Sequence, residues 1–340
     1  MVNKGKLIFF LLMCLFMSLM VTSSLGAVDI SLTEIADSLV IYVTGQKGAS
    51  LHHRIFIEIR LPRAIMAAMV GAALSLGGAL TQAYFRNPIV EPGLLGTSSG
   101  AAFGAALYFV FGSALPQFAG SFILPIMACM GAGLSSVMVV GLTKATTLES
   151  SSVVNMLLIA IAVNSIFLSG VGFLSYIAKD PQARSITFWS MGNLSGTNWQ
   201  NLMLVTTVVM VSLVASMRLA KSLNAMVMGA RDAAMMGINV KKLEWWVLLI
   251  NVIMISVVTS FVGIIAFVGL ITPHFARLLR GSNQRDILLL STVLGALFLM
   301  WADFLSRMIV RPAELPIGIL TSFVGGPVLI YLLRKKAYIF

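Results

Sequence analysis

Charge is what this sequence lacks most. Only 10% of its 340 residues are Asp, Glu, Lys or Arg, whereas a soluble domain carries about a quarter. Hydrophobic residues make up 59%, and uncharged runs long enough to cross a ~30 Å hydrocarbon core recur along the chain. These runs are continuously apolar and do not alternate, which argues against an outer-membrane barrel. The composition therefore predicts an all-α, polytopic membrane protein.

Cysteine is scarce, and a nucleotide-binding loop is missing. Cys14 and Cys129 lie inside apolar runs and are interpreted as apolar filler, so neither a disulfide framework nor a metal cluster is expected. No glycine-rich loop ends in Gly-Lys-Ser or Gly-Lys-Thr, so the chain is not expected to hydrolyse nucleotide itself. Without a cluster of nucleophile, base or metal ligands, we predict no catalytic or metal site and rank a membrane-embedded enzyme last.

Carboxylates are also missing from the middle of the apolar runs, where an ion-coupled transporter usually keeps them. Glu91, Glu244, Asp303 and Glu314 all fall at or near the ends of these runs. Glu91 before Pro92, and Glu314 near Pro316, are typical of helix N-termini. An ion-coupled secondary transporter or channel stays the alternative function, and the energy for transport is expected to arrive through a partner.

The uncharged runs predict ten transmembrane helices. A first helix of about 7–28 is interpreted as retained, because it is long for a signal peptide. The 245–276 run would form a straight helix of about 48 Å, too long for one span, so we predict a break between Gly263 and Gly269. The segment 189–199, with Trp at both ends, is predicted to lie at the interface. The other helices are expected at 64–85, 92–143 (two), 150–178, 201–217, 287–302 and 315–333.

The basic residues orient these helices. With ten spans and a cytoplasmic N-terminus, 15 of the 23 Lys and Arg residues lie inside, which follows the positive-inside rule. Residues 1–340 then form a single transmembrane domain with both termini in the cytoplasm. The eight outer basic residues are Lys47, Arg54, Arg60, Arg63, Lys179, Arg184, Arg307 and Arg311.

A polar island interrupts the apolar chain between the sixth and seventh predicted helices. Its sequence, KSLNAMVMGARDAAMMGINVKK, covers 221–242 and is too polar to cross a bilayer. Apolar residues recur in it at near-helical spacing, with glycines at 229 and 237. The charge count makes it cytoplasmic. We call it the cytoplasmic pad and expect it to dock the partner that supplies energy.

Arginine pairs mark the opposite face. Arg60 and Arg63 flank Pro62, and Arg307 and Arg311 lie at the turn between the last two helices. The guanidinium group of arginine can donate two parallel hydrogen bonds to one carboxylate, so these pairs could bind an acidic protein. Ordinary interfacial snorkelling is an equally weighted alternative.

Four long motifs in order resemble the FecCD-type permeases, the membrane subunits of ABC importers for iron-siderophores, haem and cobalamin. The resemblance implies a type II ABC importer permease fold in the bacterial cytoplasmic membrane. Glycine-rich stretches at 71–79 and 96–105 suit its close helix packing. The motifs are RLPRAIMAAMVGAALSLGGALTQAYFRNPIVEPGLLGTSSGA (60–101), RSITFWSMGNLSG (184–196), FVGLITPHFARLL (267–279) and ADFLSRMIVRPAELPIGILTSFVGGP (302–327).

The resemblance also implies partners. It implies a homodimer surrounded by membrane lipid, two separate ATPase subunits that use ATP and Mg²⁺, and a periplasmic or lipid-anchored substrate-binding protein. No cofactor bound by this chain and no nucleic acid are expected. The imported cargo would be an iron chelate, as haem or a ferric siderophore, or cobalamin.

Site residues follow from the same resemblance. Arg60 and Arg307 match the family arginines that meet glutamates on the two lobes of the binding protein, and the neighbouring Arg63 and Arg311 are included as docking candidates. The cytoplasmic gate would lie around Ser151 and Ser152. Family members usually carry an acid straight after the first glycine of the pad, whereas this chain has Ala230 there. The residues expected to couple to the ATPase are Met228, Gly229, Ala230, Arg231, Asp232, Ala233, Met236 and Gly237.

Overall fold

The protein consists of helices and their connections in the residues that its computed structural model describes, which are 4–26, 30–44, 50–112, 117–145 and 152–334. No strand occurs among these residues. The helices are α1 (Lys4–Ser24), α2 (Leu32–Thr44), α3 (Leu51–Arg54), the π-helix η1 (Ile55–Arg60), α4 (Leu61–Phe85), the 3₁₀ helix η2 (Pro92–Leu95), α5 (Thr97–Phe111), the 3₁₀ helix η4 (Gln117–Phe122), α6 (Ile123–Ala145), α7 (Ser152–Ile177), α8 (Asp180–Ser190), α9 (Trp199–Met228), α10 (Ala230–Met235), α11 (Val240–Val262), α12 (Val268–Arg280), α13 (Gln284–Met308) and α14 (Ile317–Arg334).

Seven of the described helical segments are long and apolar enough to cross a bilayer. They correspond to α1, α3 to α4 taken together, α6, α7, α9, α11 and α13. The apolar helices α5 and α14 are shorter, and α12 has 13 residues. The polytopic, all-helical fold is therefore confirmed, whereas the count of ten spans stays a prediction.

Helix α4 is the centre of the bundle. It packs against α1, α9, α11, α12 and α13, and most of its residues are buried. Small side chains allow this close approach. A methyl group added at Gly71 would overlap the carbonyl oxygen of Gly295 on α13, and one at Gly78 would overlap that of Gly269 on α12. Helix α5 meets α6 in the same way at Gly100. The predicted tight packing of the glycine-rich stretches is confirmed.

The predicted break in 245–276 lies between α11 and α12. Helix α11 ends at Gly263, whose φ of 74° favours glycine. The freed carbonyl of Val262 accepts a hydrogen bond from the Asn193 backbone N–H at 2.7 Å. Phe267 then begins α12 with a φ of 68°, and its N–H donates to the Glu91 carboxylate at 2.7 Å. Two distant segments therefore satisfy the open backbone groups.

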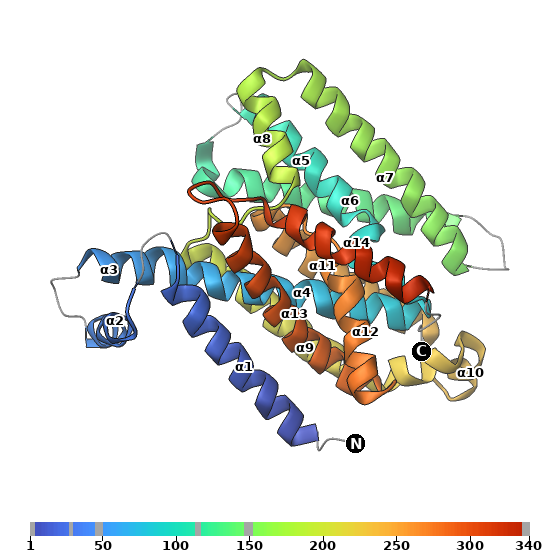
Figure 1. The fold of residues 1–340 in the computed structure, drawn as a ribbon. Coiled ribbons are helices and arrows are strands. Elements are labelled where there is room, and N and C mark those ends of the chain that lie inside the picture. The colour runs from blue at the N-terminus through green and yellow to red at the C-terminus, as the bar shows by residue number, and fades with distance from the viewer. Residues whose placement is uncertain (1–3, 27–29, 45–49, 113–116, 146–151, 335–340) are drawn as a thin grey trace.

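The bundle has two distinct ends (Figure 1). The start of α1, the end of α14 and α10 lie at one end, which we call the α10 end. Helices α2 and α3 and the α13–α14 connection lie at the other, the α2 end. The sequence did not predict α2, α3 or α8. The segment 189–199 was expected to be one interfacial element. Its two ends instead belong to helices, because Trp189 lies in α8 and Trp199 begins α9.

Candidate functional site

Two glycines shape the pad at the α10 end. Helix α9 does not stop where the apolar run stops but continues to Met228, so the first third of the pad is a helical extension. Gly229, with a φ of 142°, ends α9, and Gly237, with a φ of 83°, follows α10. Glycine takes up these angles without a side-chain penalty. The short helix α10 is thereby held between two spanning helices (Figure 1).

The surface of the pad is apolar and exposed. Met228, Met235 and Met236 are all exposed, Met235 at 74%. Arg231 is exposed beside them, whereas Ala233 is fully buried and anchors α10. Methionine side chains are flexible and adapt to a partner. An exposed apolar group at this site is suited to binding another protein.

The acid of the pad lies two residues later than in the FecCD pattern. Asp232 is in the first turn of α10, and Ala230 is only partly exposed. A carboxylate in the first turn is electrostatically favourable. Asp232 also faces back to the α9–α10 joint, where its Oδ2 would be 3.1 Å from a Cβ at Gly229. The shift therefore keeps an acid at the start of α10.

Polar contacts connect the base of the pad to the bundle. The Asn224 side-chain oxygen, near the end of α9, accepts a hydrogen bond from the Gln284 N–H at the start of α13, at 2.7 Å. Deeper in, Arg277 of α12 donates to Gln82 of α4 at 2.9 Å. Gln82 in turn donates to the Gly269 carbonyl at 3.2 Å. Movement of the α9 end would thus reach α13 directly, and the Gln82 contacts join α12 to α4.

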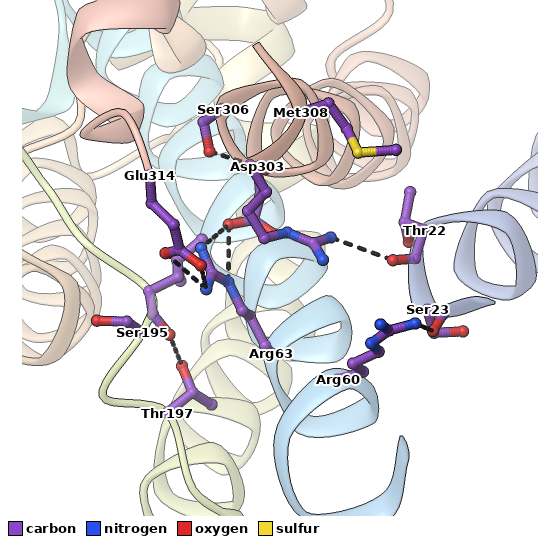
Figure 2. A network of polar contacts seen from close by, with 12 residues as sticks. Thr22, Ser23, Arg60, Arg63, Ser195, Thr197, Asp303, Ser306, Met308 and Glu314 are labelled. Atoms are coloured by element: carbon purple, nitrogen blue, oxygen red, sulfur yellow. Dashed lines mark hydrogen bonds and ion pairs between the residues drawn. The ribbon is translucent and has the colours of Figure 1, made fainter. Parts of the chain in front are cut away.

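A buried ionic network holds the α2 end together (Figure 2). Asp303 of α13 is 1% exposed and accepts from Arg63 of α4 at 2.9 Å and from Arg307 at 3.1 Å. Arg63 also donates to both oxygens of Glu314, at 2.9 and 3.0 Å. Two guanidinium groups therefore face two carboxylates. Such pairing and hydrogen bonding is what makes buried charge tolerable.

The network extends to α1. Arg307 donates to the Thr22 carbonyl at 3.1 Å, and Arg60 donates to the carbonyls of Ser23 and Ser24 at 3.2 and 2.7 Å. These carbonyls belong to the last turn of α1, which lacks intrahelical partners. The arginines therefore cap α1 and fix it against α4 and α13 (Figure 2).

This geometry changes the expectation for the outer arginines. Arg60 is 7% and Arg63 8% exposed, and Arg307 is also largely inside. Arg60 and Arg63 are too buried to contact another protein, because their guanidinium groups bind partners within the subunit. Arg311 is exposed. Docking stays a prediction, best placed on Arg311.

The sequence interpretation of Glu314 needs correction, and that of Glu91 needs an addition. Glu314 does not cap a helix start but binds Arg63. Glu91 does precede a helix start as expected, because it is the N-cap residue of η2 with Pro92 next, but its side chain accepts a hydrogen bond at the start of α12 instead. In both cases the true partner lies far away in the chain. The one local signal for the network is the spacing of Asp303 and Arg307, one helical turn apart.

A pocket of about 440 Å³ lies between η2, α5, α7 and α11, with a few polar side chains in a mainly apolar lining. Ser99 of α5 donates to Asn164 of α7 at 2.5 Å, and Asn164 donates to the Leu94 carbonyl at 3.1 Å. The expected gate lies at the other end of α7. Ser151 is outside the described residues, and Ser152 is the first residue of α7. The gate assignment stays a prediction.

Comparison with known proteins identifies the family. The model of the FecCD transport family matches residues 10–335. The chain belongs to this family. It is therefore a multi-pass transport permease of the kind found in ABC importers, and the resemblance seen in the four motifs is confirmed.

Individual FecCD relatives cover nearly the whole chain. The hemin transport system permease protein HmuU of Yersinia pestis is 33% identical over 327 residues, which is 96% of this chain and 95% of the relative. The vitamin B12 import system permease protein BtuC of Vibrio vulnificus is 33% identical over 85% of both chains. A solved inward-facing metal-chelate type ABC transporter matches with a TM-score of 0.84 and 27% identity, covering 97% of this chain and 99% of that one. The type II ABC importer permease fold is thus confirmed.

Proposed function

We propose that this FecCD protein is the permease subunit of an ATP-driven, binding-protein-dependent importer. Its cargo is haem, a ferric siderophore or cobalamin, delivered to the cytoplasm. It works in the bacterial inner membrane as a homodimer with two ATPase subunits, which use ATP and Mg²⁺. The α10 end, with both termini, faces the cytoplasm, and the α2 end faces the binding protein.

The exposed methionine surface of the pad carries this proposal. Met228 at the end of α9, Met235 on the short helix α10 and Met236 directly after it are all exposed between two spanning helices. A secondary transporter has no need for an exposed apolar helix at this point. An ATPase subunit that must push on the membrane domain needs a compact lever, and α10 has that shape.

The contacts at the base of the pad suggest how force spreads. ATP binding draws the ATPase subunits together and displaces α10. The extension of α9 moves with it and, through Asn224 and Gln284, takes α13 along. Because α13 packs tightly on α4 and α12, the inner part of the bundle moves as a unit. The cavity between the two copies then opens to one side and closes to the other.

Reconstitution tests the proposal. Vesicles that contain this chain alone should neither hydrolyse ATP nor take up cargo. Addition of the cognate ATPase and binding protein should give uptake that depends on ATP and stops without Mg²⁺. Uptake by the chain alone, driven by a proton gradient, would refute the proposal and favour the secondary-transporter alternative.

The cargo is tested on the binding protein, which captures it. A thermal-shift screen against hemin, cobalamin and ferric siderophores should raise the unfolding temperature with one class only. The same compound should then be the one that accumulates in the reconstituted vesicles. Stabilisation by none of the three would remove the cargo assignment while leaving ATP-driven import open to test.

A further inference from the structure

A groove between α6 and α11 opens near the α10 end. The two helices pack against each other, and the groove beside their contact encloses about 570 Å³. This volume lies within the ~300–1,000 Å³ of small-molecule sites. Its walls are aliphatic along most of their length, formed by Val137 and Val140 from α6 and by Leu248, Leu249 and Val252 from α11.

The mouth of the groove is basic. Lys144 near the end of α6 and Lys241 at the start of α11 both line it and are exposed. Trp245, one turn further along α11, lies beside them, and tryptophan favours the membrane interface. Glu244 also lines the groove, but its carboxylate accepts a hydrogen bond from the Tyr84 hydroxyl. The two lysines therefore leave the mouth net positive.

The groove has the length of a lipid chain. From Lys241 to Val252, α11 rises about 16 Å at ~1.5 Å per residue. This is about half of the ~30 Å hydrocarbon core, or the depth of one leaflet. A phosphate held at the lysines would place an acyl chain along the aliphatic wall, and an apolar protein segment would leave the two lysines unused.

Two residues of α6, Gly141 and Ser136, shape the wall of the groove. A Cβ added at Gly141 would meet no atom within 4 Å, so the wall is hollow there. Ser136 lines the inner part and is 2% exposed, yet its hydroxyl has no hydrogen-bond partner within the described part of the chain. A buried hydroxyl normally has a partner.

We propose that the α6–α11 groove binds one anionic glycerophospholipid of the cytoplasmic leaflet. Its phosphate lies between Lys144 and Lys241, and one acyl chain follows the aliphatic wall. Basic pockets between helices on the cytoplasmic side bind such head groups. The proposal rests on the orientation given under the proposed function, with the α10 end in the cytoplasm. Since Lys241 belongs to the pad, the lipid would contact the element through which the ATPase acts.

Lipid retention measured by native mass spectrometry tests this site. The purified chain in detergent receives phosphatidylglycerol or phosphatidylcholine with the same acyl chains. The natural chain should retain phosphatidylglycerol about tenfold better than phosphatidylcholine. The K144Q/K241Q variant should lose this preference. The matched control K221Q/K242Q removes the same charge from exposed pad lysines that do not line the groove, and it should keep the preference.

A Gly141→Leu variant tests the apolar wall. The open space at this position should accept the side chain without disturbing the fold, which an unchanged unfolding temperature would verify. Retention of both lipids should fall. Equal retention of the two lipids by the natural chain, or equal loss of preference in K221Q/K242Q, would overturn the site. So would unchanged lipid retention and preference in K144Q/K241Q.

The lipid experiment uses the chain without ATPase, binding protein or ATP. A failure of ATP-driven uptake would therefore leave its result unaffected, and a failure of lipid retention would leave the transport proposal open.

Discussion

The two ends of the bundle use polar and apolar side chains in opposite ways. At the α2 end, Arg63 and Arg307 are buried with Asp303, and their charge holds α1, α4 and α13 together. At the α10 end, Met228 at the end of α9 and Met235 on the short helix α10 are exposed. Arginine, a frequent binding residue, is here structural, whereas methionine, a frequent core residue, forms the candidate binding surface. Residue type alone would have reversed these roles.

Neutralising Asp303 should give the largest effect. In Asp303→Asn, two buried guanidinium groups lose their shared carboxylate, and we expect a loss of about 3–5 kcal/mol in the free energy of unfolding. The measurement is the unfolding transition of the purified chain in detergent. Asp232→Asn on the pad is the control and should change stability by less than about 0.5 kcal/mol. Similar losses in both variants would contradict the contrast between the ends.

Charging the pad should affect transport without affecting stability. Met235→Glu with Met236→Glu should lower ATP-driven uptake at least about tenfold, equivalent to ~1.4 kcal/mol, because the apolar contact with the ATPase is lost. Their exposure predicts an unchanged unfolding temperature. The leucine pair M235L/M236L conserves the apolar volume and should transport normally. Normal uptake by the glutamate pair would remove the pad from the coupling route.

Removing the Glu314 charge should cost less than removing that of Asp303. The Glu314 side chain is 44% exposed, and Arg63 keeps Asp303 as a partner. Glu314→Gln should therefore destabilise by about 1 kcal/mol, as for a solvated ion pair. The unfolding transition again measures it. A loss as large as that of Asp303→Asn would mean that Glu314 is part of the buried core of the network.

The smallest effect is expected at the one docking arginine that is exposed. Arg311→Glu should weaken binding of the substrate-binding protein by about two- to fivefold, as rim charges contribute less than about 1 kcal/mol. The affinity is measured with the permease in nanodiscs. Arg54→Glu, an exposed arginine at the same end, is the control. Equal weakening by both changes would indicate general charge attraction and no specific seat at Arg311.

Structural features that depend only on residues close together in the sequence could be predicted from it. The break near Gly263 follows from a run too long for one span, and the tight crossings at Gly71 and Gly78 follow from small residues in an apolar run. The continuation of α9 to Met228 could not be predicted from hydropathy, because a helix satisfies its own backbone inside or outside the bilayer. The small helix α2 packs on η1 in a separate apolar cluster that includes Ile35 and Phe56.

The sequence by itself determined the membrane class, the positions of the long apolar helices, the family and the existence of the pad. Each of these depends on composition or on spacing along the chain, which the sequence displays directly. Only the tertiary structure decided which charges are buried. Arg63 meets Asp303 and Glu314 across separations of 240 and 251 residues, and no local pattern records such a meeting. Burial in a low-dielectric interior then turns an arginine that could have bound a partner into one that holds its own subunit together.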